Sequence, residues 1–256
     1  LKVLCVGNSF ARNATKVLYQ IAEAHGVEEI VLGVLHIGGC SVQKHWNNAQ
    51  SGDYAYTYYK NITGTWDKME SVSLIYGLQD EQWDVITITQ GQGLYGIPKS
   101  YDGCLEELIG YINENKTNPD ARLFWHMTWA YQANSTHSGF ANYGKDQMTM
   151  YNAIVDAVQT KILECGHFGK VIPSGTAVQN MRTSFVGDKL TRDGYHMSYD
   201  KGRYLTALCY AKALTGCDLS SITYTPSSYT YTAEEITAMK EAADNACAKP
   251  YEVTMS

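Results

Sequence analysis

Short runs of apolar residues alternate along the chain with segments of helical periodicity. Five short, mostly apolar runs predict buried strands, at residues 3–6, 30–35, 85–89, 123–127 and 170–172. Apolar residues spaced three or four apart predict helices, at residues 13–25, 146–164, 201–214 and 233–248. Strands that lack a polar face belong to a parallel sheet covered on both sides. The pattern therefore predicts an α/β protein, a three-layer α/β/α structure with a central parallel sheet of about five strands.

The chain of 256 residues reads as one domain, 1–256, because its length suits one large α/β domain and no repeat or linker divides it. Two segments lie outside the strand–helix alternation: an aromatic-rich insertion at about 46–66 and a helical extension at about 217–256. The insertion follows the second predicted strand. It is expected either to reach the rim of a site at the sheet edge or to form a surface subdomain with its aromatic side chains packed inward. Its aromatic residues are Trp46, Tyr54, Tyr56, Tyr58, Tyr59 and Trp66.

Composition narrows the classes of function. Hydrophobic residues make up 45% and charged residues 18%, as in ordinary globular proteins. The net charge of -6 argues against a nucleic-acid partner, which needs a basic face. No apolar run approaches the roughly 20 residues of a membrane span. The seven Cys form no C-x-x-C pair and the His residues have no metal-ligand spacing, so no metal site is expected.

In a parallel α/β sheet, sites form beyond the carboxyl ends of the strands, so the residues that follow each strand matter most. Gly7-Asn8-Ser9-Phe10 follows the first strand and precedes a helix. Ser9 then lies at a helix N-terminus, where its own backbone N–H can face a developing oxyanion. The same residues also fit a simpler role, in which Asn8 or Ser9 caps the helix.

Glycines, amides and aromatic residues follow the next three strands. Gly38-Gly39 allows close backbone approach to a ligand, and a free N–H there is a possible second oxyanion donor; a plain turn is the alternative. In Gln90-Gly91-Gln92, a side-chain amide is a possible third hydrogen-bond donor to the oxyanion; the alternative is a polar loop with a conformationally permissive glycine. His126, Trp129 and Tyr131 end or follow the fourth strand, where they would line a pocket or pack beneath a loop.

Asp193-Gly194-Tyr195-His196 precedes the helix that begins near residue 201. An Asp and a His three apart on a turn can hydrogen-bond, which fixes the imidazole tautomer and leaves the other ring nitrogen facing a nucleophile. Surface polar residues often show the same spacing, so this pattern alone is weakly specific.

The order of these motifs resembles that of the SGNH hydrolases, also called GDSL esterases. Their signature blocks carry Ser, Gly, Asn and His in that order, and the resemblance covers residues 1 to about 215. Asn8 replaces the usual Asp before the serine, and Gln90-Gly91-Gln92 replaces the expected Gly-x-Asn. The chain is most similar to a poorly characterised group of Bacteroides-type bacterial SGNH-like proteins. The resemblance implies the flavodoxin-like SGNH hydrolase fold. Together with the absent initiator Met, it also implies an exported protein, either periplasmic or secreted.

The resemblance assigns roles to the residues at the strand ends. Ser9 is the expected nucleophile, His196 its acid–base partner and Asp193 the group that orients His196. The backbone N–H groups of Ser9 and Gly39 and the side chain of Gln90 are expected to form the oxyanion hole, with Gln92 as the second candidate amide. The residues expected to bind substrate are Asn8, Gln92, His126, Trp129 and Tyr131.

The predicted function is that of a serine esterase that hydrolyses a small acyl group, acetyl above all, from a small-molecule or glycan ester without a cofactor. Aromatic faces stack well on sugar rings, which favours a carbohydrate partner. A carbohydrate-binding protein of weak or absent activity and a lipid esterase are the alternatives, because a fold does not fix function. A flavodoxin-like nucleotide binder is disfavoured, since the first strand has no glycine-rich phosphate loop after it.

Overall fold

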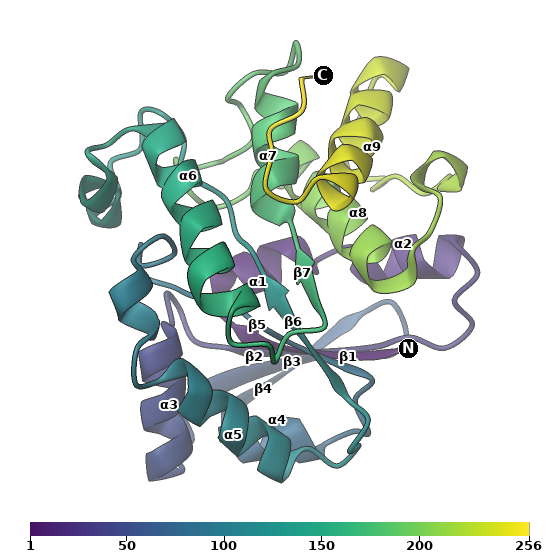
Figure 1. Cartoon of the computed structure of the whole chain (residues 1–256). Coiled ribbons are helices and arrows are strands. Elements are labelled where there is room, and N and C mark those ends of the chain that lie inside the picture. The colour runs from purple at the N-terminus through teal and green to yellow at the C-terminus, as the bar shows by residue number, and fades with distance from the viewer. Residues whose placement is uncertain (256) are drawn as a thin grey trace.

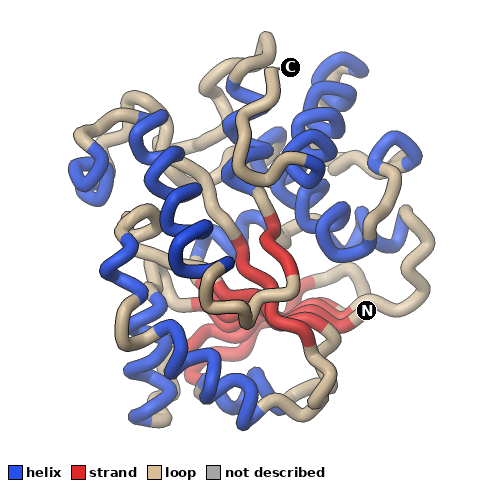
Figure 2. The backbone as a smooth tube through the Cα atoms, in the orientation of Figure 1, coloured by secondary structure: helices blue, strands red, loops and turns tan. Residues whose placement is uncertain are grey.

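The computed structural model describes residues 1–255, which form a seven-stranded sheet with helices on both sides (Figures 1 and 2). The strands are β1 (Lys2–Gly7), β2 (Val31–His36), β3 (Tyr56–Asn61), β4 (Trp66–Val72), β5 (Val85–Ile88), β6 (Arg122–His126) and β7 (Lys170–Ile172). Their order in the sheet is β4-β3-β2-β1-β5-β6-β7. The five strands predicted from the sequence, β1, β2, β5, β6 and β7, are all present and parallel, which confirms the fold class.

The helices form the two outer layers of the domain. They are α1 (Ser9–Ala14), α2 (Leu18–Ala24), α3 (Val42–Ser51), α4 (Leu74–Gln79), α5 (Leu105–Asn115), α6 (Gln147–Ala157), α7 (Ser174–Arg182), α8 (Lys201–Thr215) and α9 (Ala233–Ala248). Short turns of other helix types are η1 (Pro98–Tyr101), η2 (Ser138–Tyr143), η3 (Val158–Leu163) and η4 (Leu219–Ser221). The helices α3, α4 and α5 pack together on one face, and α1, α2, α7, α8 and α9 pack on the other (Figure 1).

The chain changes direction across the sheet at β1. It runs from β1 to β2 on one side and later crosses to β5 on the other side of β1. The loops that follow these three strands therefore leave the same carboxyl edge and diverge there, which is where α/β sheets of this kind place their sites.

The aromatic-rich insertion extends the sheet. Its strand β3 pairs antiparallel with β2 and with β4, which begins where the insertion ends. This hairpin adds two strands to one side of the parallel sheet and makes β4 the edge. Tyr56 and Tyr58 are buried in the core. The Arg12 guanidinium of α1 lies over two aromatic rings of the hairpin, 4.1 Å from the centroid of Tyr59 and 4.2 Å from that of Trp66. Cation–π contacts of this kind attach α1 to the edge of the sheet.

The C-terminal extension completes one helical layer. Its helix α9 packs against α7 and α8 through small buried side chains, among them Ala242 and Ala246. A capping box at its start, in which Thr232 and Glu235 bond each other's backbone N–H groups, satisfies donors that a helix start leaves open. Of the helices in residues 1–255, none has the length and apolar character that crossing a membrane requires.

Two histidines are buried in the core without charge. His45 Nδ1 lies 2.9 Å from the Tyr56 hydroxyl, and His126 Nε2 lies 3.1 Å from the Ser174 hydroxyl. Burial lowers the pKa of each imidazole to about 3. Protonating either ring would place a charge where solvent does not reach it.

Acid is therefore expected to destabilise the fold before the carboxylates lose their charge. Below about pH 6.5 the unfolded chain takes up protons on these two residues and the folded chain does not, so stability rises with pH between about 3 and 6.5. Each histidine is expected to remove on the order of 2 kcal/mol of unfolding free energy between pH 7 and pH 5. Urea unfolding at both pH values measures this difference.

His45→Gln and His126→Gln should each reduce the pH dependence by about one histidine's share, even if they lower the stability at pH 7. His25→Gln is the matched control, because His25 is exposed at the end of α2. Equal stability at pH 7 and pH 5 would contradict the prediction.

Candidate active site

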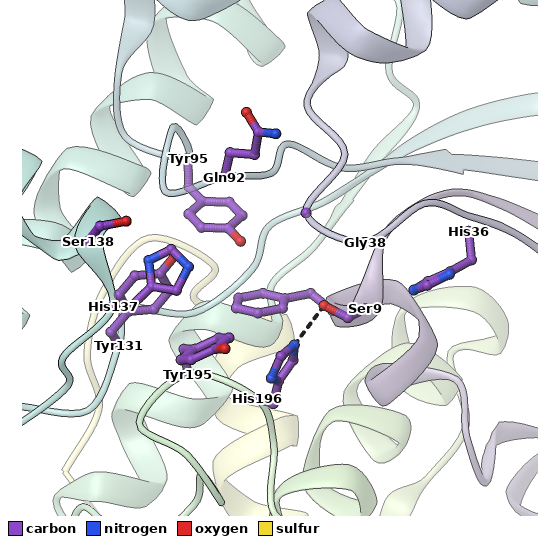
Figure 3. A pocket seen from close by; sticks show the side chains of 12 residues that line it. Ser9, His36, Gly38, Gln92, Tyr95, Tyr131, His137, Ser138, Tyr195 and His196 are labelled. Atoms are coloured by element: carbon purple, nitrogen blue, oxygen red, sulfur yellow. Dashed lines mark hydrogen bonds between the residues drawn. The ribbon is translucent and has the colours of Figure 1, made fainter. Parts of the chain in front are cut away.

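Three side chains from opposite ends of the chain form a hydrogen-bonded line at the carboxyl edge of the sheet. Ser9 begins α1 directly after β1, and His196 lies in the loop before α8. His196 Nε2 lies 2.8 Å from Ser9 Oγ (Figure 3). His196 Nδ1 lies 2.6 Å from Asp193 Oδ2. The structure thus brings together the serine, histidine and aspartate that the sequence motifs singled out.

The Asp193 carboxylate orients the His196 ring. Its Oδ1 accepts hydrogen bonds from the backbone N–H groups of His196 at 2.7 Å and Tyr195 at 3.2 Å. Partial burial opposes ionisation of Asp193, but the hydrogen bonds from the His196 side chain and from these N–H groups outweigh it and lower the pKa of Asp193. An ionised Asp193 receives the Nδ1–H of His196, so Nε2 is free to accept the Ser9 hydroxyl proton.

A second set of contacts holds the two segments together. Asn13 of α1 donates from its side chain to the Ser9 carbonyl at 2.6 Å and accepts from the Arg192 guanidinium at 3.0 Å. Arg192 also donates to the Met197 carbonyl at 2.6 Å. The loop that carries His196 is therefore tied to the helix that carries Ser9 independently of the Ser9–His196 contact.

Asn8 is a structural residue and does not line the pocket, contrary to its expected role in binding substrate. Its side chain is 1% exposed. The amide nitrogen donates to the Cys40 carbonyl at 3.1 Å and the Gln90 carbonyl at 2.9 Å, and the amide oxygen accepts from the Phe10 N–H at 3.0 Å. Asn8 therefore caps α1 and joins the loops that follow β1, β2 and β5.

Two backbone N–H groups are candidates for an oxyanion site beside Ser9. Within residues 1–255, neither the Ser9 N–H nor the Gly39 N–H has a hydrogen-bond acceptor in the protein. Gly38 and Gly39 both line the pocket. Gly39 has a φ of +63°, a conformation that side-chain-bearing residues rarely adopt. Glycine takes up this conformation without the steric cost that a side chain would add.

Gln90 does not face Ser9, so the expectation that its side chain completes the oxyanion hole is corrected. Its Oε1 accepts from the N–H groups of Val42 at 2.9 Å and Gly91 at 3.0 Å, and its Nε2 donates to Ser100 Oγ at 3.1 Å. These contacts hold the amide at the start of α3. Gln92 does line the pocket, but its amide points away from Ser9 (Figure 3).

The pocket around Ser9 has a volume of about 650 Å³. It is lined by Ser9, Phe10, His36, Gly38, Gly39, Gln92, Tyr95, Tyr131, His137, Ser138, Tyr195 and His196. Of the aromatic residues predicted near the site, Tyr131 lines the pocket. Among the described residues, none of the six aromatic residues of 46–66 contributes to this lining. Tyr56 and Tyr58 are buried in the core, Tyr59 and Trp66 lie against Arg12, Trp46 is on α3, and Tyr54 is exposed.

Trp129 and His126 lie beneath the pocket and do not line it, which corrects their expected role in binding substrate. The Trp129 ring stacks on Phe10 with centroids 4.4 Å apart, and its Nε1–H donates to the Tyr195 carbonyl at 2.7 Å. His126 is buried beside Ser174. Trp129 thus supports both the helix of Ser9 and the loop of His196 from below.

Sequence reasoning gave no pocket role to Phe10, His36, Tyr95, His137, Ser138 and Tyr195. His36 could have been found from the sequence, because it ends the second strand two residues before Gly38. Tyr195 could also have been found, because it directly precedes His196. Tyr95 and His137 lie in loops with no periodic pattern, and only the folded chain brings them to Ser9. Across residues 1–255, no three His, Cys, Asp or Glu side chains are close enough to hold a metal ion.

The chain has the fold of the SGNH-like α/β hydrolases, a mostly parallel sheet with helices on both sides. Residues 2–246 match the family described as "Domain of unknown function (DUF4886)". The chain belongs to this family, which agrees with the predicted resemblance to Bacteroides-type SGNH-like proteins. No curated protein matches the sequence.

Solved structures agree on the fold. A DUF4886 family protein from Bacteroides uniformis is 40% identical, with a TM-score of 0.94 over 99% of this chain and 97% of its own. A candidate SGNH hydrolase from Slackia heliotrinireducens is 19% identical, with a TM-score of 0.55 over 84% and 98%. An acetylxylan esterase from Geobacillus stearothermophilus is 12% identical, with a TM-score of 0.51 over 87% and 94%.

Replacing Asn8 with Asp is expected to destabilise the site and the fold together. A carboxylate cannot donate to the Cys40 and Gln90 carbonyls, and it would place an unpaired charge against them. The expected loss is on the order of 3 kcal/mol, or a fall in Tm of roughly 10 °C, measured by thermal unfolding. Asn47→Asp is the matched control, because Asn47 is exposed and its side chain only accepts. A Tm shift equal to the control's would contradict the prediction.

Proposed function

We propose that the protein is a serine esterase in which Ser9 attacks the ester carbonyl. The observation that carries the proposal is the line from Ser9 Oγ through His196 to Asp193, with contacts of 2.8 and 2.6 Å, in an open pocket. His196 Nε2 takes the hydroxyl proton as the Ser9 oxygen bonds to the carbonyl carbon, and Asp193 stabilises the resulting imidazolium.

Collapse of the tetrahedral intermediate breaks the ester bond, and His196 returns its proton to the leaving alcohol. Water then attacks the acyl-Ser9, with His196 as the base, and releases the acid. In both steps the Ser9 and Gly39 N–H groups donate to the oxyanion. The loss of one such donor typically costs about 2.7–4 kcal/mol of transition-state stabilisation. The Gln90 amide takes no part, because Val42, Gly91 and Ser100 already bind it.

The substrate class that suits the pocket is a small acyl ester, acetyl above all, of a polyhydroxylated alcohol such as a glycan. The rings of Tyr95, Tyr131 and Tyr195 line the pocket together with the polar side chains of His36, His137 and Ser138. Sugars present both apolar ring faces and hydroxyl groups, so a lining of this mixed kind suits them. An acetylxylan esterase shares the fold, which is consistent with this class.

Hydrolysis of p-nitrophenyl acetate by the purified protein tests the proposal. Ser9→Ala is expected to lower kcat by on the order of a million-fold, to the background rate, because it removes the nucleophile. Asp193→Asn is expected to lower kcat by roughly ten-thousand-fold, because the wrong His196 tautomer then faces Ser9. Gln90→Ala should cost far less than either variant.

The acyl preference is tested with an acetate-to-octanoate series. Acetate is expected to be the best substrate, and faster turnover of octanoate would favour a lipid esterase. If the wild type and Ser9→Ala both bind an acetylated glycan and neither turns over any ester, the protein is a carbohydrate-binding protein and the esterase proposal fails.

A further inference from the structure

A second imidazole, that of His137, lies in the pocket and is held by its own helix turn. His137 precedes η2, and its Nδ1 accepts a hydrogen bond from the Gly139 N–H at 3.0 Å. Figure 3 shows the ring across the pocket from Ser9, beside Tyr131. The proposed reaction leaves this ring without a role.

The contact with Gly139 fixes which nitrogen of His137 carries a proton. Burial, and after it the charge of the neighbouring His196, lowers the pKa of His137, so the ring is neutral near pH 7. A neutral imidazole has one N–H, and an Nδ1 that accepts leaves that N–H on Nε2. Within residues 1–255, His137 Nε2 has no hydrogen-bond partner in the protein.

Two tyrosines fix the direction of this ring. The centroid of His137 lies 4.8 Å from that of Tyr131, at an interplanar angle of 56°, and 4.6 Å from that of Tyr195, at 69°. Tyr195 in turn packs against His196, with ring centroids 4.3 Å apart. The ring is therefore packed between two side chains and bonded at one nitrogen, so its free N–H is a preorganised donor on the pocket wall.

The position of His137 indicates which part of an ester it would bind. An acetyl group has one carbonyl oxygen, and the Ser9 and Gly39 N–H groups are the proposed donors to it. A donor on the other side of the pocket meets no further acceptor on so small an acyl group. Its acceptor must then belong to the alcohol part of the ester.

We propose that His137 is a specificity-determining residue that donates a hydrogen bond from Nε2 to a hydroxyl or ring oxygen of a polyhydroxylated alcohol, such as a sugar. This inference rests on the proposed esterase function and specifies it further. A site that hydrogen-bonds part of its substrate discriminates against analogues lacking the acceptor, because the donor is then left unpaired.

Two substitutions separate the binding role of His137 from its role in the turn. In His137→Asn, the side-chain oxygen can replace Nδ1 as the acceptor of the Gly139 N–H, since Asn is a preferred residue at such positions, but the Nε2 donor is lost. In His137→Gln, the longer side chain brings an amide N–H toward the position of Nε2 and loses the cap. His25→Asn, on the exposed end of α2, is the matched control.

The readout is the ratio of kcat/KM for a monoacetylated methyl pyranoside to kcat/KM for p-nitrophenyl acetate, whose leaving group has no hydroxyl. His137→Asn is expected to lower this ratio about tenfold, the effect of one lost hydrogen bond, mainly through KM. His137→Gln should restore part of it, and His25→Asn should leave it unchanged. The ratio stays unchanged in His137→Asn if both kcat/KM values fall equally or if neither falls. Either result would show that His137 acts only in the turn and would overturn the inference.

Calorimetric binding of the same pyranoside to Ser9→Ala, with and without His137→Asn, distinguishes failure of the inference from failure of the esterase proposal. Weaker binding in the double variant, about tenfold by the same reasoning, supports the donor role even if no ester is turned over. Equal binding by the two proteins overturns that role, and absence of turnover by the wild type on both esters overturns the esterase proposal alone.

Discussion

The buried amide of Asn8 is the contact on which the geometry of the site depends. The amide donates to the carbonyls of Cys40, after β2, and Gln90, after β5, and it caps α1, which follows β1. Three loops are therefore joined at this one side chain. The loops are in close contact there: a Cβ on Gly91 would lie 2.1 Å from the Cys40 carbonyl oxygen. Ser9 follows this amide directly and Gly39 precedes one of its acceptors. The spacing between the serine and the candidate oxyanion donors is therefore set by a residue that touches neither substrate nor solvent.

The parts of the structure that the sequence predicted are those with a local signal. Each of the five parallel strands is mostly apolar and has no polar face, as in a sheet covered on both sides. Ser9, Asp193 and His196 were found because each follows a strand or precedes a helix, and the carboxyl ends of parallel strands share one edge. Their mutual contacts follow from that topology and from the three-residue spacing of Asp193 and His196.

The parts that the sequence did not predict depend on contacts between distant segments. Gln90 and Gln92 look equivalent in the sequence. Only the packing of α3 against the loop after β5 determines that the Gln90 amide binds the start of α3, while Gln92 lines the pocket. The aromatic residues of the insertion looked suited to a sugar, but β2 would otherwise have an open edge, and the hairpin pairs with it. His137 reaches the pocket on a loop without periodicity, so no pattern indicated it.

The contact between Ser9 and His196 spans 187 residues of chain. On a ribosome, α1 emerges early, while the loop that carries His196 is made after all seven strands of the sheet. Any nascent chain that stops short of this loop holds a serine without its imidazole. Under the proposed function, such a fragment has no activated nucleophile, and the serine becomes reactive only after the chain has been made beyond His196.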